Sequence, residues 1–375
     1  MRSTRRSLRP SAVEFVESLS PWPAEFGLER IKALLGRLGD PQLRYPSIHI
    51  VGTNGKTTTS RMTEALLAGE GLYVGAYTSP HVGGWAERIR VGGKSTDFEA
   101  AVERVRRAAE EVEATQFEVL TAAALLEFAE QNVDVAVVEA GLGGRYDATN
   151  VLRSPVQVLT NVGLDHTQVL GETREEIAIE KLAVVRPGST VILGEPEWEE
   201  LARANGAAVV VVTGRSNIAC AVAAAESFLG RPVDPSPARE LRLPGRLLER
   251  RGESPLEIWD GAHNPNGVGY LLGRLPSRRY VVACSILEDK DAETMLGGLG
   301  AVGDVLVATR SSNPRSLAAE ELARIAARFF DQVEVVTDPA PALERARSVA
   351  GPDGAVLVTG SLYLLDDLSA VQRTA

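Results

Sequence analysis

The chain has few cysteines, only Cys220 and Cys284 among its 375 residues. They lie far apart in different sequence patterns, so they form neither a disulfide framework nor the paired spacing of a zinc site. We expect both to be small buried hydrophobic side chains. Long hydrophobic runs are also missing, which argues against membrane spans. No apolar stretch follows the basic start MRSTRRSLRPSAVEF, so we expect a cytoplasmic protein without a signal peptide.

Positive charge is the second deficit. Lys and Arg number 40 against 50 Asp and Glu, which gives a formal net charge of -10. A nucleic-acid-binding protein needs a basic face that displaces counterions, so this balance argues against nucleic acid as a partner. Anionic ligands must then be held by local means: backbone N–H groups, a few placed cations and metal ions.

What the chain does have is length and alternation. Short runs rich in Val and Ile, such as SIHIV, DVAVVEA and STVILG, alternate with helical patterns. This alternation predicts an α/β fold with a mostly parallel sheet covered on both faces. The length of the chain suggests two domains. The proline-rich stretch at about 230–245 predicts a linker between a larger domain at 1–240 and a smaller Rossmann-like α/β domain at 241–375.

The stretch GTNGKTTT follows the predicted strand SIHIV and precedes a helical pattern, which is the context of a phosphate-binding loop. Its glycines let backbone N–H groups turn inward, and the helix N-terminus adds positive potential. Lys56 supplies a point charge for the terminal phosphates. A hydroxyl, that of Thr57 or Thr58, can ligate Mg²⁺. The alternative is a glycine-rich turn with a surface lysine.

Polar residues follow two further predicted strands. Glu139 ends the strand at 133–138, and a carboxylate there suits Mg²⁺ at the edge where open α/β sheets bind ligands, although it could be only a cap or an ion-pair partner. Asp165 and His166 follow the next strand, and we expect them at the same sheet edge. Like His166, His81 and His263 stand at the ends of apolar runs, where sites are built.

Two more segments contain candidate site residues. Thr173 and Glu176 form a predicted capping box, which places Lys181 on a helix. The residues alone favour a solvent-exposed lysine paired with a nearby glutamate. In the second domain, IWDGAHNPNG reads as strand, polar loop and helix, so Asp260, His263 and Asn264 cluster there; the alternative is an Asx turn before a helix.

The chain resembles the folylpolyglutamate synthase and dihydrofolate synthase family in the order of its motifs. In chain order these motifs are GTNGKTTT, YTSPHVGGWAERIRVGG, TQFEVLTAAAL, EAGLGGRYDATNV, GLDHTQVLGETREEIAIEK, LPGR, DGAHNP, EDKD and TGSLYLL. This family is a branch of the Mur ligase superfamily. The resemblance covers nearly the whole chain. It implies an ATP-dependent ligase that joins L-glutamate to dihydropteroate or to the γ-carboxylate of a reduced folate through an acyl phosphate. The implied protein is a monomer that binds neither nucleic acid nor membrane.

The resemblance also assigns roles to residues. Lys56, Lys181 and His166 are the implied catalytic residues. Two Mg²⁺ ions are implied, with ligands Ser79, Glu139, His166, Lys181 in carbamylated form, and Thr57. ATP contacts are implied for Gly52, Thr53, Asn54, Gly55, Lys56, Thr57, Thr58, Asn217, Arg246 and Asp260. Contacts to the pterin or to glutamate are implied for Gly27, Leu28, Pro80, His81, Arg88, Thr115, Phe117, Arg145, His263 and Asn264.

The sequence departs from the family pattern at two places. The family usually has Gly after the loop lysine, whereas this chain has Thr57, as cell-wall Mur ligases do. Either Thr57 or Thr58 could therefore contact Mg²⁺. The lysine helix reads EKLAVV where the family usually has EKAGI. Two other functions are possible interpretations of the sequence: a Mur-type ligase that acts on a UDP-sugar peptide, and a nucleotide-binding regulatory module without catalysis. The TSPH to ERI segment and DGAHNP argue against the first, and retention of Lys56, Glu139, His166 and Lys181 argues against the second.

Overall fold

The computed structural model describes residues 10–246, 248–250 and 254–374. Two compact units divide the chain. The first comprises residues 1–79, 85–164 and 170–241, and the second comprises 80–84, 165–169 and 242–375. The proline-rich stretch contributes the short helix α10 (Ser236–Glu240) to the first unit, and the chain passes to the second between Leu241 and Arg242. The functional division at 1–240 and 241–375 stays a prediction.

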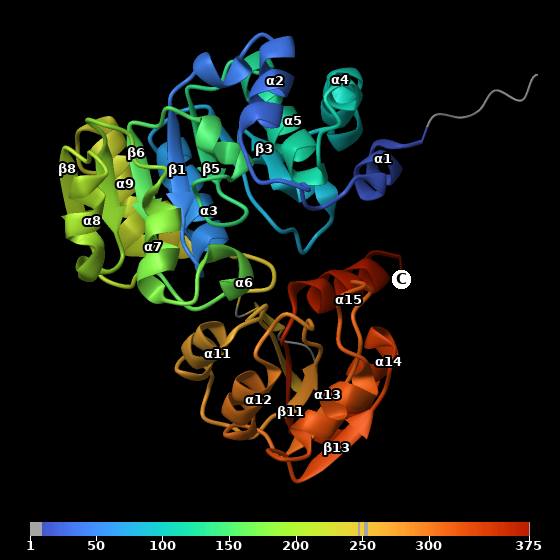
Figure 1. Ribbon diagram of the computed structural model, residues 1–375. Helices are drawn as coiled ribbons and strands as arrows, with labels where there is room; N and C mark the ends of the chain where they lie inside the picture. The colour runs from blue at the N-terminus through green and yellow to red at the C-terminus, as the bar shows by residue number, and fades with distance from the viewer. Residues whose placement is uncertain (1–9, 247, 251–253, 375) are drawn as a thin grey trace, which may run out of the picture. The chain divides into compact units, whose positions relative to one another are not determined.

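The first unit is built on an eight-stranded sheet with the order β4-β3-β2-β5-β1-β6-β7-β8 (Figure 1). Strands β2, β5, β1, β6, β7 and β8 run parallel to one another. Strands β3 and β4 extend the sheet beyond β2 through antiparallel pairing. The central strands are buried along their whole length, which explains their continuous apolar sequences. The strands are β1 (Ser47–Val51), β2 (Val74–Tyr77), β3 (Ile89–Val91), β4 (Lys94–Ser95), β5 (Val135–Glu139), β6 (Val156–Leu159), β7 (Thr190–Leu193) and β8 (Val209–Val212).

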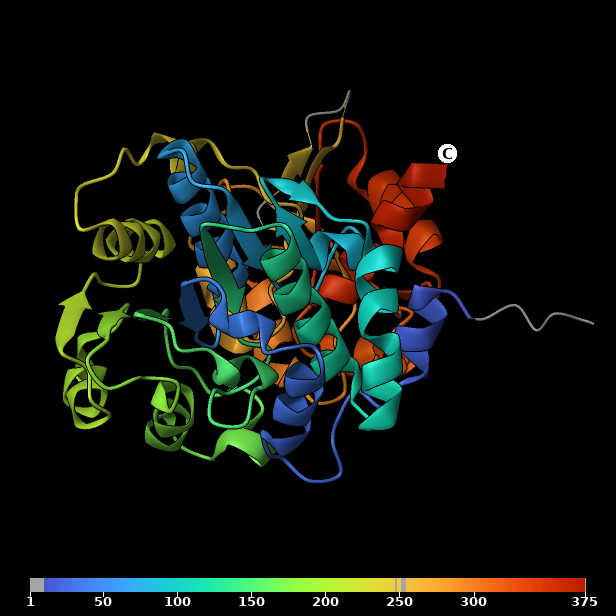
Figure 2. The ribbon, with the colours of Figure 1, turned by 90° about the horizontal axis from the view of Figure 1, so that it is seen from above.

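Helices cover both faces of this sheet, as Figure 2 shows from above. On one face α3, α9 and α10 share an apolar cluster with the sheet, while α5 with α4 and α7 with α8 form clusters on the other. These helices are α1 (Ala12–Ser18), α2 (Glu29–Arg37), α3 (Lys56–Gly69), α4 (Phe98–Glu111), α5 (Gln116–Glu130), α7 (Arg174–Leu182), α8 (Glu199–Ala204), α9 (Asn217–Leu229) and α10, with short 3₁₀ turns η1 (Pro41–Leu43), η2 (Trp85–Arg88), η3 (Ala148–Val151) and η4 (Pro196–Trp198).

The second unit has a six-stranded sheet with the order β13-β12-β11-β14-β10-β9, parallel except for β9. The elements are β9 (Leu248–Arg250), β10 (Leu256–Trp259), β11 (Val281–Cys284), β12 (Val305–Ala308), β13 (Gln332–Val335) and β14 (Ala355–Thr359), with α11 (Pro265–Leu272), α12 (Ala292–Gly300), α13 (Ala319–Ala326), α14 (Pro339–Ala350) and α15 (Leu362–Thr374); α6 (Thr167–Leu170) lies at a boundary between the units. The predicted fold class is therefore confirmed.

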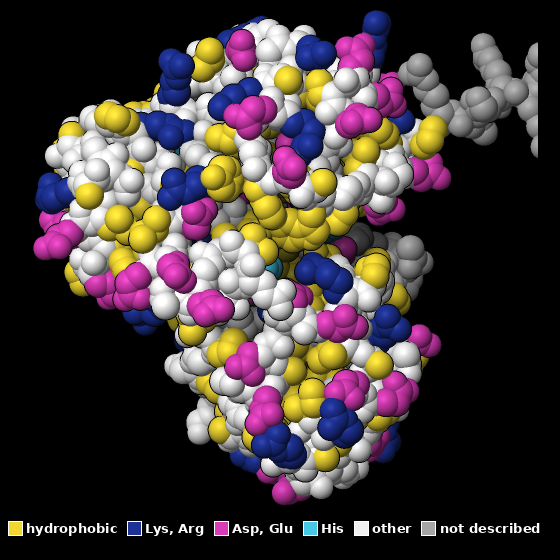
Figure 3. All heavy atoms as spheres, in the orientation of Figure 1, with side chains coloured by type: hydrophobic (Ala, Val, Ile, Leu, Met, Phe, Trp, Pro, Cys, Tyr) yellow, Lys and Arg dark blue, Asp and Glu magenta, His cyan; other side chains and the backbone are white. Residues whose placement is uncertain are grey.

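Surface and core follow the expected patterns. Cys220 and Cys284 are both buried. Acidic and basic side chains are interspersed over the face in Figure 3. Helix α4 buries Phe98 and Val105, and its charged side chains are mostly exposed, although Arg106 is buried. Within the described ranges, no helix is both long and apolar enough to cross a membrane.

Candidate active site

The phosphate-loop sequence lies between β1 and α3, as predicted. Gly52 and Gly55 have φ values of 152° and 80°, which side chains disfavour. A Cβ atom at Gly52 would lie 1.9 Å from Thr160 Oγ1, and one at Gly55 would lie 2.4 Å from Asn217 Oδ1. The two glycines are therefore required by backbone conformation and by space, and Asn217 lies directly against the loop.

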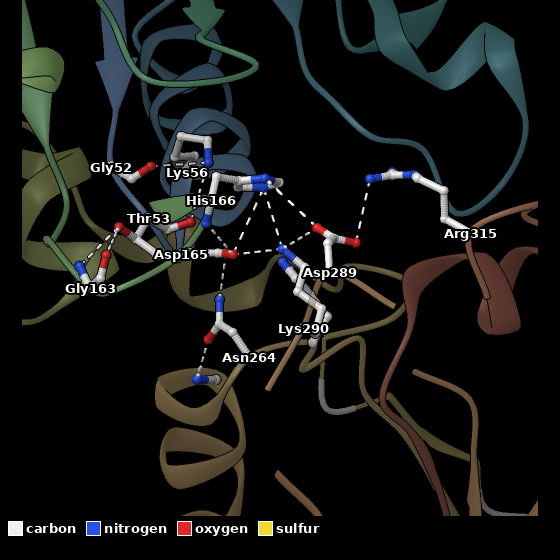
Figure 4. Close-up of polar contacts among 12 residues, drawn as sticks. Gly52, Thr53, Lys56, Gly163, Asp165, His166, Asn264, Asp289, Lys290 and Arg315 are labelled. Carbon is white, nitrogen blue, oxygen red and sulfur yellow. Dashed lines mark hydrogen bonds and ion pairs between the residues drawn. The ribbon is translucent and has the colours of Figure 1, made fainter. Parts of the chain in front are cut away.

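The loop is braced by the segment that follows β6. Asn54 N–H donates to Asn161 Oδ1 at 3.0 Å, and Thr160 Oγ1 donates to the Asn54 carbonyl oxygen at 2.7 Å. Thr53 exchanges hydrogen bonds with Gly163 (Figure 4). Thr160 and Asn161 were not singled out from the sequence, although the polar TN pair directly after a strand marks the same sheet edge. They connect the phosphate loop to the segment that follows β6.

Two lysines converge on the loop. Lys56 Nζ donates to the carbonyl oxygens of Gly52 at 3.1 Å and Thr53 at 3.3 Å (Figure 4). Lys181 Nζ, from α7, donates to the Gly52 carbonyl oxygen at 3.0 Å. The side chain of Lys181 is buried, so the interpretation as a solvent-exposed lysine was wrong. The capping box of Thr173 and Glu176 is present; packing of α7 on the sheet, which its sequence alone does not reveal, turns Lys181 inward.

Glu139 ends β5 beside the start of α3. Its Oε1 accepts a hydrogen bond from Thr57 Oγ1 at 3.0 Å, and its Oε2 accepts one from Ser79 N–H at 3.2 Å. Glu139 is 1% exposed, so this carboxylate is held in a fixed position in a dry setting. The geometry gives Thr57 the contact with the strand-end carboxylate, whereas the sequence left Thr57 and Thr58 equivalent.

Oxygen donors of this kind fit a magnesium ion. Mg²⁺ is commonly held by one or two carboxylates together with water and substrate phosphate oxygens, and Glu139 with the Thr57 hydroxyl provides such a set beside a phosphate loop. Among the described residues, no three His, Cys, Asp or Glu side chains gather in a way that would suit a metal ion. A metal here would therefore depend on hydroxyl and phosphate oxygens as well as on Glu139.

The residues expected to contact the pterin lie in several different segments of the first unit. Phe117 packs over Gly141, where a Cβ atom would lie 2.5 Å from the ring. Thr115 caps α5 in a capping box with Glu118, and Arg145 pairs with Glu180 at 2.7 Å. Arg88 is buried with its guanidinium 4.7 Å from the Trp85 ring centre. Gly27 and Leu28 directly precede α2.

A buried polar chain beside Phe117 was missed. Asp147 accepts hydrogen bonds from Leu142 N–H at 2.8 Å and from Thr149 Oγ1 at 2.5 Å, and His49 Nε2 lies 2.8 Å from the same Thr149 oxygen. Since Thr149 gives its proton to Asp147, His49 must donate through Nε2. Burial raises the pKa of Asp147, and burial, more than the charge of Arg186, lowers the pKa of His49 to about 3.

The second unit contains its own polar cluster, centred on Asp165 and Lys290 (Figure 4). Lys290 Nζ donates to Asp165 Oδ1 at 2.6 Å and lies 3.3 Å from His166 Nε2, while Asn264 Nδ2 donates to Asp165 Oδ2 at 3.0 Å. Burial of the Asp165 carboxyl acts to raise its pKa, but the Lys290 charge holds this pKa well below its usual range. Residues 165–169 belong to this unit. The expectation that Asp165 and His166 share a sheet edge with Glu139 stays a prediction.

The remaining second-unit candidates lie in neighbouring loops. Arg246 reaches Gly261, where a Cβ atom would lie 2.8 Å from its Nη1, and Asp260 Oδ1 accepts from Ala262 N–H at 2.9 Å. His263 Nδ1 lies 2.8 Å from the Gly261 carbonyl oxygen, and burial lowers its pKa to about 4, so the ring is neutral at pH 7. Following Pro80, His81 Nε2 lies 3.5 Å from Asp366 Oδ2. Lys290 was overlooked as a site residue, although EDKD was a recognised motif.

A parallel sheet with a phosphate loop, followed by a second parallel-sheet unit, is the architecture of Mur ligases. Residues 50–227 match the Mur ligase middle domain, and residues 245–362 match the Mur ligase glutamate ligase domain. The chain is 33% identical to the dihydrofolate synthase/folylpolyglutamate synthase of Mycobacterium tuberculosis, over 91% of this chain and 89% of that protein. The chain belongs to the dihydrofolate synthase/folylpolyglutamate synthase family, as the motifs predicted.

Solved structures agree with this assignment. E. coli FolC in complex with DHPP and ADP superposes with a TM-score of 0.88 at 30% identity, covering 98% of each chain. A bifunctional folylpolyglutamate synthase/dihydrofolate synthase with Mn, AMPPNP and L-glutamate bound has a TM-score of 0.86 at 29% identity, covering 98% of this chain and 100% of that one. The predicted enzyme class, an ATP-dependent ligase, is confirmed by these relatives.

Proposed function

We propose that this protein uses ATP to join L-glutamate to dihydropteroate, to the γ-carboxylate of a reduced folate, or to both. The observation that carries this proposal is the Thr57 to Glu139 hydrogen bond of 3.0 Å at the mouth of the phosphate loop. It fixes a carboxylate and a hydroxyl where the phosphates of a nucleotide held by Gly52–Thr58 would lie. Relatives of nearly full length, with nucleotide, DHPP or glutamate bound, support the same reaction.

The proposed reaction has two steps, phosphoryl transfer and amide bond formation. A carboxylate oxygen of the pterin substrate attacks the γ-phosphorus of ATP, and ADP leaves with the electron pair of the broken P–O bond. The amine of glutamate then attacks the acyl phosphate carbonyl carbon, loses a proton and expels phosphate. Both steps depend on positioning and on neutralising negative charge. In this chain Lys56 supplies a cation, and the glycine backbone of the loop supplies N–H donors.

The proposed metal is Mg²⁺, as two ions, with Ser79, Glu139, His166, Lys181 and Thr57 as ligands. When bound, magnesium neutralises phosphate charge and polarises the transferred phosphoryl group. We propose that Lys181 is carbamylated, which would turn its ammonium into a carboxylate-like ligand. Its burial 3.0 Å from the Gly52 carbonyl oxygen supports a role at the loop. The role of His166 rests on its motif alone.

The other roles are proposed on the same basis. Asn217 is a proposed ATP contact, supported by its position against Gly55, whereas the ATP roles of Arg246 and Asp260 rest on their motifs. Glutamate is proposed to meet His263 and Asn264, and the pterin to meet Phe117 and its neighbours. We further propose an ATP-binding domain at 1–240, a glutamate-ligase domain at 241–375, and a cytoplasmic monomer that needs neither nucleic acid nor membrane.

The test is phosphate release by the purified protein with ATP, Mg²⁺ and L-glutamate. We expect release only when dihydropteroate or a reduced folate is added, and mass spectrometry of the products should show one added glutamyl residue or more. Running both pterin substrates in parallel separates the two activities. Release with a UDP-muramyl acceptor and with neither pterin would overturn the proposal in favour of a cell-wall ligase.

A further inference from the structure

The first unit contains a cavity at the end of its sheet away from the phosphate loop. The cavity has a volume of about 830 Å³ and is lined by residues that precede β6 and β7, including Pro155 and Gly188, and by Lys32 of α2. The phosphate loop follows the opposite, carboxyl end of the parallel strand β1. Four to five residues of strand separate the two ends, or about 15 Å, so the cavity is separate from the proposed nucleotide site.

Its charge is the reverse of that of the whole chain. Three cations, Lys32, Arg153 and Arg186, line it together with one carboxylate, Asp40, in a protein whose net charge is -10. The Asp40 carboxylate accepts a hydrogen bond from Gln42 Nε2 at 3.1 Å. Among the described ion pairs, the nearest acid to a lining cation is Glu29, whose Oε1 lies 3.8 Å from Lys32 Nζ, and both of those side chains are largely exposed.

The two arginines are the unusual feature. Arg186 is half-buried and donates to backbone and amide oxygens, those of Leu152 and Asn150, at 2.6–3.0 Å. Within the part of the chain that the structure describes, neither it nor Arg153 forms an ion pair with a carboxylate. Burial and, second, the Arg153 charge lower the pKa of Arg186. Like charges in one cavity destabilise the protein unless an anion compensates them.

We propose that this cavity is a second anion-binding site, which takes a small organic polyanion through Arg153, Arg186 and Lys32. Guanidinium groups bind phosphate and carboxylate oxygens in the same forked geometry, so the shared chemistry is that of an oxyanion with at least two negative charges. A cavity of this volume is in the range that holds small-molecule ligands. The proposal is independent of the ligase reaction and would stand if the proposed substrates were wrong.

Arg186 also connects the cavity to the glycine-rich loop after Glu139. It holds the Asn150 carbonyl and side-chain oxygens, and Asn150 Nδ2 donates to the Arg145 carbonyl oxygen at 2.8 Å. Replacing Arg186 would therefore disturb this loop as well as the cavity. Arg153 is exposed and takes part in no such bracing, which makes it the appropriate residue for a binding test.

The test is isothermal titration calorimetry on the full chain with Mg²⁺ and saturating ADP, so that the nucleotide site is filled. Pyrophosphate and citrate are the probes, and the variants are Arg153→Gln and Lys32→Gln. Arg278→Gln, an exposed arginine of the second unit, is the matched control. We expect a single class of site in the wild type and in the control, weakened about tenfold or more in both cavity variants.

If the cavity variants lose pyrophosphate binding but keep citrate binding, the site prefers a phosphorylated ligand. If they lose citrate binding but keep pyrophosphate binding, the site prefers a polycarboxylate. Loss of both would define an oxyanion site without preference between the two. If neither probe binds the wild type, or if both bind all variants with equal affinity, the proposal is overturned. Thermal unfolding of each variant distinguishes lost binding from lost folding.

Discussion

Lys181 Nζ donates a hydrogen bond to the carbonyl oxygen of Gly52, 3.0 Å away, and so connects helix α7 to the phosphate loop. The two residues are 129 positions apart in the sequence. The contact places a buried ammonium beside the glycine that begins the loop, close to where a nucleotide phosphate is proposed to bind.

Replacing Lys181 tests that connection. We expect Lys181→Ala to lower kcat by about 100-fold or more, because a charged group aimed at a phosphoryl-transfer site is removed. If the lysine acts as a carbamate, short carboxylates such as acetate or formate should restore part of the rate. Lys94→Ala, at an exposed lysine of β4, is the control and should keep full activity. A Lys181→Ala enzyme with the wild-type rate would rule out the metal-bridging role.

Thr57 and Thr58 can be separated by the same substitution at each. Thr57→Val removes the hydroxyl that donates to the buried Glu139 carboxylate, so we expect a lower rate and a higher Mg²⁺ concentration for half-maximal activity. The rate loss should be about 10- to 100-fold. Thr58→Val should change the Mg²⁺ dependence much less. Equal Mg²⁺ titrations for the two variants would contradict the assignment of Thr57 to the metal.

Gly52 should not tolerate a side chain. A Cβ atom would lie 1.9 Å from Thr160 Oγ1 at a φ of 152°, so Gly52→Ala should displace the loop and destabilise the fold by about 1–3 kcal/mol. We expect loss of ADP binding, measured by fluorescence titration. The control is Gly36→Ala in helix α2, where an added Cβ meets no atom within 4 Å. That change should raise stability by about 0.5–1 kcal/mol and leave binding intact.

The buried His49 makes stability depend on pH. Its pKa is lowered to about 3 in the folded protein, against about 6.5 in the unfolded chain. As pH falls through this window, the unfolded chain binds a proton that the folded protein does not, so the free energy of unfolding falls by up to about 1.4 kcal/mol per pH unit. Above pH 6.5 this contribution is complete and constant.

His49→Gln keeps a donor for Thr149 but does not titrate. Urea unfolding at a series of pH values should therefore show a shallower loss of stability between pH 6 and pH 4 for the variant than for the wild type. Both proteins carry the same other titrating groups, so the difference between their profiles isolates His49. Parallel profiles over that range would show that His49 is not the buried neutral group described.

The sequence by itself determined the features that depend on local patterns. The phosphate loop between strand and helix, the capping box of α7 and the buried parallel strands all follow from glycine positions, capping residues and apolar runs, which act over a few residues. The family assignment likewise rests on motifs in chain order. These features need no knowledge of which distant segments meet.

Tertiary structure decided what depends on distant segments. Packing of α7 buried Lys181 against Gly52, although its sequence neighbourhood suggested an exposed ion pair. The register between β5 and β1 brought Glu139 to the start of α3, where its carboxylate meets Thr57 and not Thr58. Contacts with Lys290 and Asn264 drew Asp165 into the second unit. Arg153 and Arg186 share a cavity only because β6 and β7 are neighbours in the sheet. In each case the deciding energy comes from burial and long-range pairing, which no local sequence pattern encodes.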